Sequence, residues 1–276
     1  MGAIDWEKHM ANDDPFAKFK AMQRESWKLF APLAQFTTPG AAHLVKFAGV
    51  SKGQAVLDVA CGTGVVAVTA ARAGARVKAL DLSPALLDDA RKNAAIIGAA
   101  IEFTEGDVEA LPYKDAEFDV VLSQFGHMFA PRPEFAVREM LRVLKPGGRI
   151  AFSTWPPELM IGLCFATVSR YLPPPPPGVA PPPQWGDPSI IRERLGAAVT
   201  SIEFHREELA FPALSPQHYR ANMELTAGPV IKAVEMLSSD PPKLAAFRVE
   251  LEALAERFFD GNRVRQSFLM TRAVKK

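Results

Sequence analysis

Two glycines near residue 60 and two carboxylates on either side of them have the types and spacing of a ligand-binding loop. Residues 56–67 read VLDVACGTGVVA, in which Gly62 and Gly64 follow one apolar run and precede another that no helix breaker interrupts. This order predicts a strand, a tight turn and a helix. A glycine turn that opens a helix presents bare backbone and free N–H groups to a ligand. Asp58 precedes the glycines, and Asp81 lies 19 positions after Gly62.

The loop by itself fits two classes of ligand. GTGVVA matches the dinucleotide pattern, and Asp81 lies about 20 residues further on, where such folds place a ribose-binding acid. That is the pattern of an NAD(P)-dependent oxidoreductase of Rossmann fold. The negative charge of Asp58 disfavours a pyrophosphate and suits a ligand with ammonium and sulfonium groups, such as S-adenosylmethionine. Asp107, in EGDVEALPY, is placed to accept a hydrogen bond from an adenine amine.

The elements that must position these residues alternate along the chain. Strand-like runs occupy 55–59, 76–80, 101–103, 118–123 and 149–154, with helix-like runs between them. Ser83 as N-cap, Pro84 and Gly98 bound one of these helices, and a second ends at the Pro-Gly-Gly of LKPGG. Later, 200–211 and 264–274 alternate like strands, and 216–260 is mainly helical in pattern. The fold class predicted is α/β, with a doubly wound, mostly parallel sheet.

Composition excludes several classes of partner. The chain has 276 residues, 48% hydrophobic and 23% charged, as expected of a soluble globular protein of one or two domains. Its formal net charge of +1 gives no reason to expect nucleic acid or an anionic membrane. Two cysteines, Cys61 and Cys164, favour a reducing compartment, taken as the cytoplasm. No signal-peptide core occurs in MGAIDWEKHMANDDP, and the apolar run 159–168 is about half the length of a membrane span, so no integral membrane association is expected.

Five motifs, in order and spacing, resemble one family. VLDVACGTG, LDLS, GDVEALPY, FDVVLSQFGHMF and LKPGGRI are similar to class I S-adenosylmethionine-dependent methyltransferases, particularly the small-molecule type that includes quinone methyltransferases. The resemblance covers residues 20–155 strongly and the rest in outline. It implies a Rossmann-like, seven-stranded, mostly parallel sheet whose last strand inserts antiparallel. The segments 200–211 and 264–274 would be the two late strands.

The resemblance also implies roles for residues of the first two strand ends. Asp58, Gly62 and Gly64 correspond to the loop that lines the methionine and ribose parts of the cofactor. Asp81 corresponds to the acid that binds both ribose hydroxyls, and Leu82 beside it is taken as a further cofactor contact. These assignments make S-adenosylmethionine the expected cofactor and S-adenosylhomocysteine the product.

Further along the chain, the implied contacts reach the other parts of the cofactor. Asp107 corresponds to the residue facing the adenine amine, with the Val108 N–H beside the ring. Gln124 and Phe125 fall at the end of the fourth strand, against the methionine end and the methyl group. Trp27, with Phe30 and Phe36, is a candidate wall for the sulfonium through cation–π contact, or else ordinary core packing; these three aromatic residues lie in the N-terminal segment.

Methyl transfer is an in-line displacement, so the protein must mainly align the reactants and exclude water. No Cys/His cluster has metal-ligand spacing, and we expect no metal. An acceptor N–H, O–H or acidic C–H can need a base, and His127 in SQFGHMF is the candidate general base. Its alternative role is structural, at the start of the following helix or bonded to a backbone carbonyl.

The expected domain organisation is an N-terminal helical flap, 1–45, and a methyltransferase domain, 46–276. Within the latter, 156–200 is a proline-rich and helical segment, and 212–262 is a helical cover over the acceptor site. The aromatic residues that flank these irregular segments are unranked candidates for the acceptor pocket: Trp155, Tyr171, Trp185 and Tyr219.

The apolar lid segments favour a small, hydrophobic or aromatic acceptor with a methylated N, O or C atom. SQFG stands where amino-methylating DNA and glutamine enzymes carry an Asp/Asn-Pro-Pro-aromatic stretch, which disfavours a nucleic-acid substrate. Two rival functions remain at this stage: the NAD(P)-dependent oxidoreductase, and a non-catalytic S-adenosylmethionine-binding protein. Neither the acceptor atom nor the oligomeric state follows from the residues.

Overall fold

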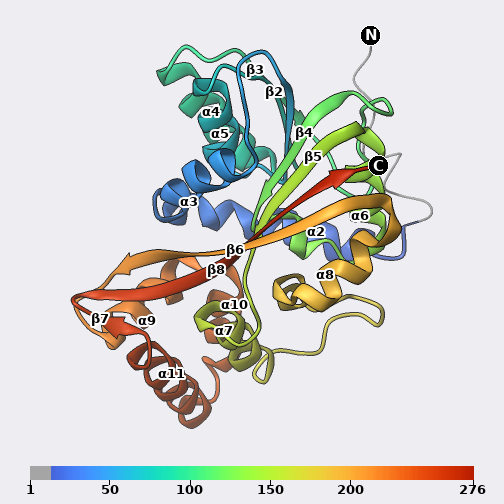
Figure 1. The fold of residues 1–276 in the computed structure, drawn as a ribbon. Helices are drawn as coiled ribbons and strands as arrows, with labels where there is room; N and C mark the ends of the chain where they lie inside the picture. Colours follow the sequence, from blue (N-terminus) through green and yellow to red (C-terminus); the bar gives the residue numbers. More distant parts are fainter. Residues whose placement is uncertain (1–13) are drawn as a thin grey trace.

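One mixed β-sheet runs through the molecule (Figure 1). The computed structural model describes residues 14–276, and its strand order is β3-β2-β1-β4-β5-β8-β6. The strands are β1 (Ala55–Val59), β2 (Arg76–Asp81), β3 (Ile101–Glu105), β4 (Phe118–Gln124), β5 (Leu144–Thr154), β6 (Val199–Pro212) and β8 (Arg263–Lys275). A further short strand, β7 (Phe259–Asp260), pairs with β8 and was not predicted.

The direction of the strands confirms the predicted fold class. Strands β1 to β5 pair in parallel, whereas β8 lies antiparallel between β5 and β6. Val56, Leu57 and Val59 of β1, which lies between β2 and β4, are fully buried, as expected of a parallel strand covered on both faces. The molecule is therefore a Rossmann-like α/β fold with an inserted antiparallel strand.

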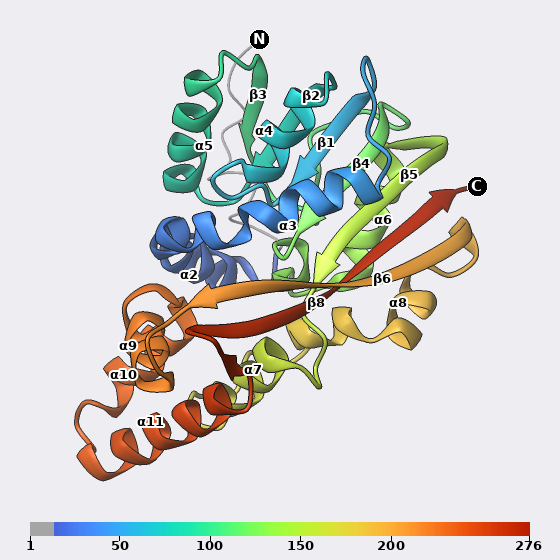
Figure 2. The ribbon, with the colours of Figure 1, turned by 60° about the vertical axis from the view of Figure 1, so that its left-hand side comes forward.

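Helices cover the two faces of this sheet (Figure 2). The helices of one face are α3 (Ala34–Phe47), α4 (Val65–Arg72) and α5 (Pro84–Ile96), and those of the other are α6 (Pro133–Val143) and α8 (Pro188–Leu195). Helix α2 (Ala17–Trp27) and the 3-10 helix η1 (Lys28–Leu33) lie at the carboxyl ends of the parallel strands, where Arg24 pairs with Glu105. Ligands of open α/β sheets bind at these carboxyl ends.

The predicted start of α5 is confirmed, whereas the predicted end of α6 is displaced. Ser83 is the N-cap residue of α5, but its side chain does not cap the helix, and its backbone N–H donates to Asp81 Oδ1 at 2.8 Å. Helix α6 ends at Val143, and LKPGG begins β5, because Leu144 already has extended backbone and pairs with Phe118.

The predicted boundary between flap and main domain falls inside α3. Ala41 and Leu44 of this helix, and Ala48 directly after it, are fully buried in the main core. Helix α3 thus packs on the sheet as a core element. The N-terminal helical segment that lies at the strand ends is α2 with η1. Residues 1–13 of the predicted flap lie outside the described part, and they include most of the N-terminal peptide MGAIDWEKHMANDDP.

Strands β6 and β8 continue beyond the sheet as a two-stranded ribbon, and a second core forms around its far end (Figures 1 and 2). The helices of this core are α7 (Met160–Ser169), α9 (Pro216–Thr226), α10 (Gly228–Leu237) and α11 (Pro241–Glu256). The mainly helical pattern of 216–260 is confirmed. Residues 173–181, the proline-rich stretch, form neither helix nor strand. None of the helices within residues 14–276 has the length and apolarity to cross a bilayer.

Candidate functional site

The turn after β1 exposes its backbone to a cavity at the carboxyl ends of the strands. Gly62 has a positive φ of 53°, and a side chain built on it would meet nothing within 4 Å. Gly62 lines the cavity, which has a volume of about 250 Å³. The glycine thus allows a ligand to approach the bare chain at the start of α4.

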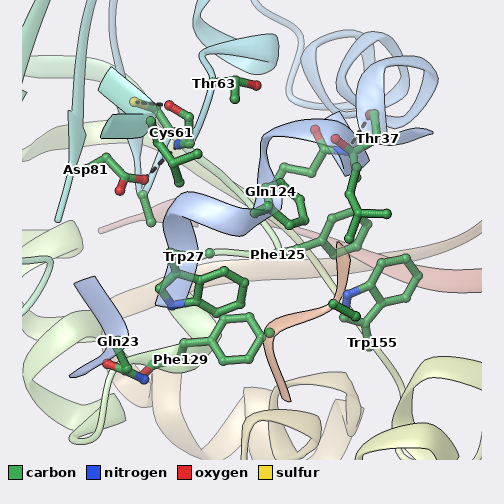
Figure 3. A pocket seen from close by; sticks show the side chains of 18 of the residues that line it. Gln23, Trp27, Thr37, Cys61, Thr63, Asp81, Gln124, Phe125, Phe129 and Trp155 are labelled. Carbon is green, nitrogen blue, oxygen red and sulfur yellow. Dashed lines mark hydrogen bonds between the residues drawn. The ribbon is translucent and has the colours of Figure 1, made fainter. Parts of the chain in front are cut away.

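Two buried carboxylates flank this turn. Asp58 Oδ2 accepts a hydrogen bond from the Ala67 N–H at 2.8 Å, while Asp58 Oδ1 has no partner among the described residues. Asp81 Oδ2 accepts from the Gly62 N–H at 2.7 Å (Figure 3). Burial raises the pKa of both carboxyls, and for Asp58 the charge of Asp81 adds to the rise, against the lowering effect of these backbone bonds. A cationic ligand group beside Asp58 would stabilise its ionised form.

Aromatic side chains form the opposite wall of the cavity. Phe125 stacks on Trp155, with ring centroids 4.0 Å apart and an interplanar angle of 9° (Figure 3). Phe125 adopts φ 60°, an uncommon conformation for a residue with a side chain. The following Gly126 permits the close approach of two loops, because a Cβ there would lie 2.5 Å from Ala60 Cβ. The backbone after β4 therefore turns the Phe125 ring into the cavity.

The structure gathers nearly all the predicted cofactor residues around this one cavity. Those that line it are Trp27, Asp58, Gly62, Asp81, Leu82, Asp107, Val108, Gln124 and Phe125. Phe30 and Phe36 also line it, as do Trp155 and Tyr219, whereas Tyr171 and Trp185 do not.

Gly64 stands apart from these residues. It is the N-cap of α4 with φ 80°, and a Cβ there would lie 3.1 Å from Ala90 Cβ of α5. Gly64 is not among the cavity-lining residues. The prediction that it contacts the cofactor directly is therefore replaced by a role in the turn and in the close packing of α4 on α5.

His127 also lies away from the cavity. It begins the short helix η2 (His127–Phe129), is fully buried, and packs its ring against Trp185 and Phe152 at centroid distances of 4.5 and 4.7 Å. Neither ring nitrogen has a partner in the described part of the chain, and burial together with the charge of Arg194 lowers the pKa of His127 to about 3. This placement corrects the expectation that His127 faces the acceptor as a general base.

A buried lysine that the sequence did not single out closes the adenine end predicted for the cavity. Lys20 of α2 is 2% exposed, and its Nζ lies 2.6 Å from carboxylate oxygens of Asp14, Asp107 and Glu109. Glu109 is also paired with Arg132 at 2.6 Å. No local sequence pattern predicts this cluster, because Lys20 and Asp107 are 87 residues apart.

The same cluster is the one place within residues 14–276 where three or more possible metal-ligating side chains approach one another closely. Oxygen atoms of Asp14, Asp107 and Glu109 lie within 4.8 Å of one another. The Lys20 ammonium already lies at hydrogen-bond distance from all three. The arrangement is thus an ion-pair cluster that fastens α2 to the loop after β3.

Comparisons with known proteins agree with this geometry. Residues 57–152 match a family described as a methyltransferase domain. The chain is 33% identical over 256 residues to an uncharacterized protein of Mycobacterium tuberculosis, covering 91% of this chain and 93% of the relative. It is also 34% identical over 152 residues to a ubiquinone biosynthesis O-methyltransferase of Salmonella arizonae, covering 54% of this chain and 63% of that enzyme.

The chain is a class I S-adenosylmethionine-dependent methyltransferase. A solved structure, that of a putative methyltransferase from Bacillus halodurans, has the same fold, with a TM-score of 0.58 and 22% identity over 85% of this chain and 98% of that one. Within this methyltransferase the family match runs from β1 to β5 and includes Asp58, Asp81 and Phe125. Lys20 and the helices of the second core lie outside the match.

Proposed function

We propose that this methyltransferase binds S-adenosylmethionine at the turn after β1 and transfers its methyl group to a small, neutral, hydrophobic or aromatic acceptor. The observation that carries this proposal is the division of one cavity into two halves. Asp58, Asp81 and the open backbone of Gly62 face one half, and Phe125 and Trp155 wall the other. A cationic, hydroxyl-rich cofactor suits the first half, and an apolar molecule suits the second.

The polar half fits the cofactor residue by residue. The unpartnered Asp58 Oδ1 suits the ammonium of the methionine part, and Asp81 suits the ribose hydroxyls. Asp107 lies beyond β3, where it would face the adenine amine, and its Oδ2 lies 2.6 Å from Lys20 Nζ. Charge-assisted bonds of this kind are roughly twice as strong as neutral ones.

A nicotinamide dinucleotide suits the same half poorly. Lys20 is the one basic side chain among the described residues that line the cavity, and three carboxylates already neutralise it. Asp58 and Asp81 would therefore meet a pyrophosphate without a counter-charge nearby. This charge distribution supports the methyltransferase over the oxidoreductase.

The apolar half has the tasks of alignment and exclusion of water. When bound, S-adenosylmethionine supplies a methyl group on a positively charged sulfur, which a nucleophile displaces in line. Phe125 and Trp155 present flat apolar faces, which suit the positioning of an aromatic acceptor. Cys164 and Tyr219 also line the cavity, but burial raises their pKa values, that of Cys164 to about 12, so neither is a base near neutral pH. The acceptor atom must then be nucleophilic without help from these groups.

The helices carried by the ribbon form the cover of this half. Tyr219 and Met223 of α9 and Val230 of α10 line the cavity, and all three belong to the second core. The segment 212–262 would thus determine which acceptor fits, while the β1–β5 half holds the cofactor.

Calorimetric titration with S-adenosylmethionine, S-adenosylhomocysteine and NAD tests the cofactor assignment. We expect both adenosyl compounds to bind, NAD not to bind, and Asp81→Asn to weaken binding by an order of magnitude or more, since a charge-assisted bond contributes about 1.5–3 kcal/mol. Asp88→Asn, an exposed carboxylate on α5, is the matched control. Binding of NAD alone would overturn the proposal. Formation of S-adenosylhomocysteine with a cell extract as acceptor pool would separate an enzyme from a non-catalytic binding protein.

A further inference from the structure

One polar residue interrupts the buried face of the β6–β8 ribbon. Along β8, Val264, Gln266 and Phe268 alternate onto the same face, and Gln266 is only 6% exposed. Its register partner on β6 is Leu209, which also lines the cavity. An amide on such a face is costly to bury unless it is hydrogen-bonded.

Gln266 lies close to the aromatic wall of the acceptor half. Phe268, two residues further along β8, places its ring 5.4 Å from that of Phe125 and 6.1 Å from that of Trp155. Two residues of a strand span roughly 7 Å, so Gln266 lies about the width of one aromatic ring from Phe268 along β8. It therefore lies along the acceptor half, away from Asp81 and the glycine turn.

The partner of Gln266 is the hydroxyl of Tyr219 on α9. Gln266 Nε2 donates to Tyr219 Oη at 3.1 Å, and both residues line the cavity. The Tyr219 ring is 3% exposed and is held edge-on by Phe211, with centroids 5.0 Å apart. The hydroxyl is thus fixed at the junction of the ribbon and the covering helix.

The pair of Gln266 and Tyr219 has more hydrogen-bond donors than its single bond uses. The amide has two N–H hydrogens and the hydroxyl has one, yet a single bond joins the two side chains, and neither has another partner within residues 14–276. Exchanging the amide oxygen and nitrogen of Gln266 would still leave an N–H unused. Buried donors are nearly always paired, so a ligand oxygen would complete the set.

The charged groups of the cavity lie elsewhere. Those among the described lining residues are Lys20, Asp58, Asp81 and Asp107, from α2 and the ends of β1 to β3. The residues around Tyr219 and Gln266 are apolar, among them Phe211, Met223 and Val230. An ionised acceptor there would lose its hydration without gaining a counter-charge.

We infer that Tyr219 and Gln266 are specificity-determining residues, which donate a hydrogen bond to an oxygen atom of a neutral, otherwise apolar acceptor molecule. The inference rests on the proposed function, because it takes the other half of the cavity to hold the cofactor. It assigns the acceptor to neutral compounds with a carbonyl, ether or hydroxyl oxygen, and disfavours carboxylates and ammonium compounds.

Equilibrium dialysis with four naphthalenes of closely similar size tests this. The probes are 2-isopropenylnaphthalene, 2-acetonaphthone, 2-naphthoate and 2-(aminomethyl)naphthalene, each measured on the full chain with and without saturating S-adenosylhomocysteine. We expect 2-acetonaphthone to bind about threefold to tenfold more tightly than its apolar isostere 2-isopropenylnaphthalene, the range of one neutral hydrogen bond. The two ionised probes should bind at least as weakly as 2-isopropenylnaphthalene.

Variants isolate the hydrogen bond. Tyr219→Phe keeps the ring on Phe211 and should reduce the preference for 2-acetonaphthone over 2-isopropenylnaphthalene, and Tyr219→Phe/Gln266→Leu should abolish it. Tyr171→Phe is the matched control, because the Tyr171 hydroxyl bonds Glu250 and does not line the cavity.

The outcomes separate this inference from the proposed function. Three results would overturn the inference about Tyr219 and Gln266. These are an unchanged preference for 2-acetonaphthone in the double variant, tighter binding of either ionised probe, and no binding of any probe. Titration of S-adenosylhomocysteine tests the cofactor half independently, and we expect the same affinity in all four proteins. Failure of the wild-type protein to bind it would count against the proposed function and leave the naphthalene result to stand by itself.

Discussion

Lys20 Nζ lies 2.6 Å from Asp107 Oδ2, and this ion pair joins helix α2 to the loop that follows β3. Burial by itself would lower the pKa of Lys20, but the carboxylates of Asp107, Asp14 and Glu109 outweigh it and raise that pKa. The ammonium thus stays charged over the working pH range. A buried charge cluster thus fastens the N-terminal helix to the end of the cavity that carries Asp107.

Replacing Lys20 should weaken the attachment of helix α2 to the loop after β3. Lys20→Met leaves three carboxylates close together, with Arg132 as their remaining cation, and uncompensated buried charge costs about 3–5 kcal/mol. We expect the free energy of unfolding in urea to fall by about that amount, and the affinity for S-adenosylhomocysteine to fall with it. Lys18→Met, an exposed lysine of the same helix, is the control and should change neither quantity. Equal stability of the two variants would show that the cluster does not hold α2.

The buried Asp58 predicts a pH dependence of cofactor binding. Burial and the charge of Asp81 raise the pKa of Asp58 well above 3.8, so part of the carboxyl is protonated in mild acid. Since an ammonium group binds the ionised form, affinity for S-adenosylhomocysteine should rise with pH across this range.

The Asp58→Asn variant tests that dependence. Its amide oxygen can still accept from the Ala67 N–H, so the turn keeps its backbone bond. Calorimetry between about pH 5 and 7.5 should show roughly tenfold weaker binding at neutral pH and a flatter pH profile, since the charge-assisted bond is lost. Parallel pH profiles for the two proteins would remove Asp58 from the ammonium site.

His127 predicts acid sensitivity of the fold. Its pKa is about 3 in the folded chain against 6.5 for an unperturbed histidine, so the unfolded chain binds the proton first as pH falls. Stability is therefore lost as pH decreases from 6.5 towards 3, by about 2 kcal/mol at pH 5. His127→Leu should lose less stability than the wild type between pH 7 and 5 in urea titrations. An unchanged acid response in His127→Leu would refute the argument.

Sequence patterns predicted the sheet well because its signals are local. The strand that leads to Gly62 and the alternating runs 200–211 and 264–274 each show their period over a few residues. The carboxyl ends of parallel strands meet at one edge, so Asp58, Asp81 and Asp107 were placed together by topology.

The positions of other residues depend on contacts that no local pattern encodes. His127 lies three residues after the cavity-lining Gln124, but the chain turns at Phe125 through a positive φ and directs the histidine under Trp185. Lys20 lies in a polar helix, and its contact with Asp107, 87 residues away in the sequence, forms only in the folded chain. The pair of Gln266 and Tyr219 likewise forms only when the ribbon folds against α9.

Gly64 gives a test of why the turn needs its second glycine. An alanine there would adopt φ 80°, which costs about 1–2 kcal/mol, and would place its Cβ 3.1 Å from Ala90 Cβ. Gly53→Ala is the matched control, with φ 84° and nothing within 4 Å of the added Cβ, so it carries the strain without the contact. We expect Gly64→Ala to lower the melting temperature more than Gly53→Ala. Because Gly64 does not line the cavity, the affinity of the folded Gly64→Ala protein for S-adenosylhomocysteine should change less than twofold to threefold, roughly the effect of a small shift in the turn. A large loss of affinity at unchanged stability would restore Gly64 as a direct cofactor contact.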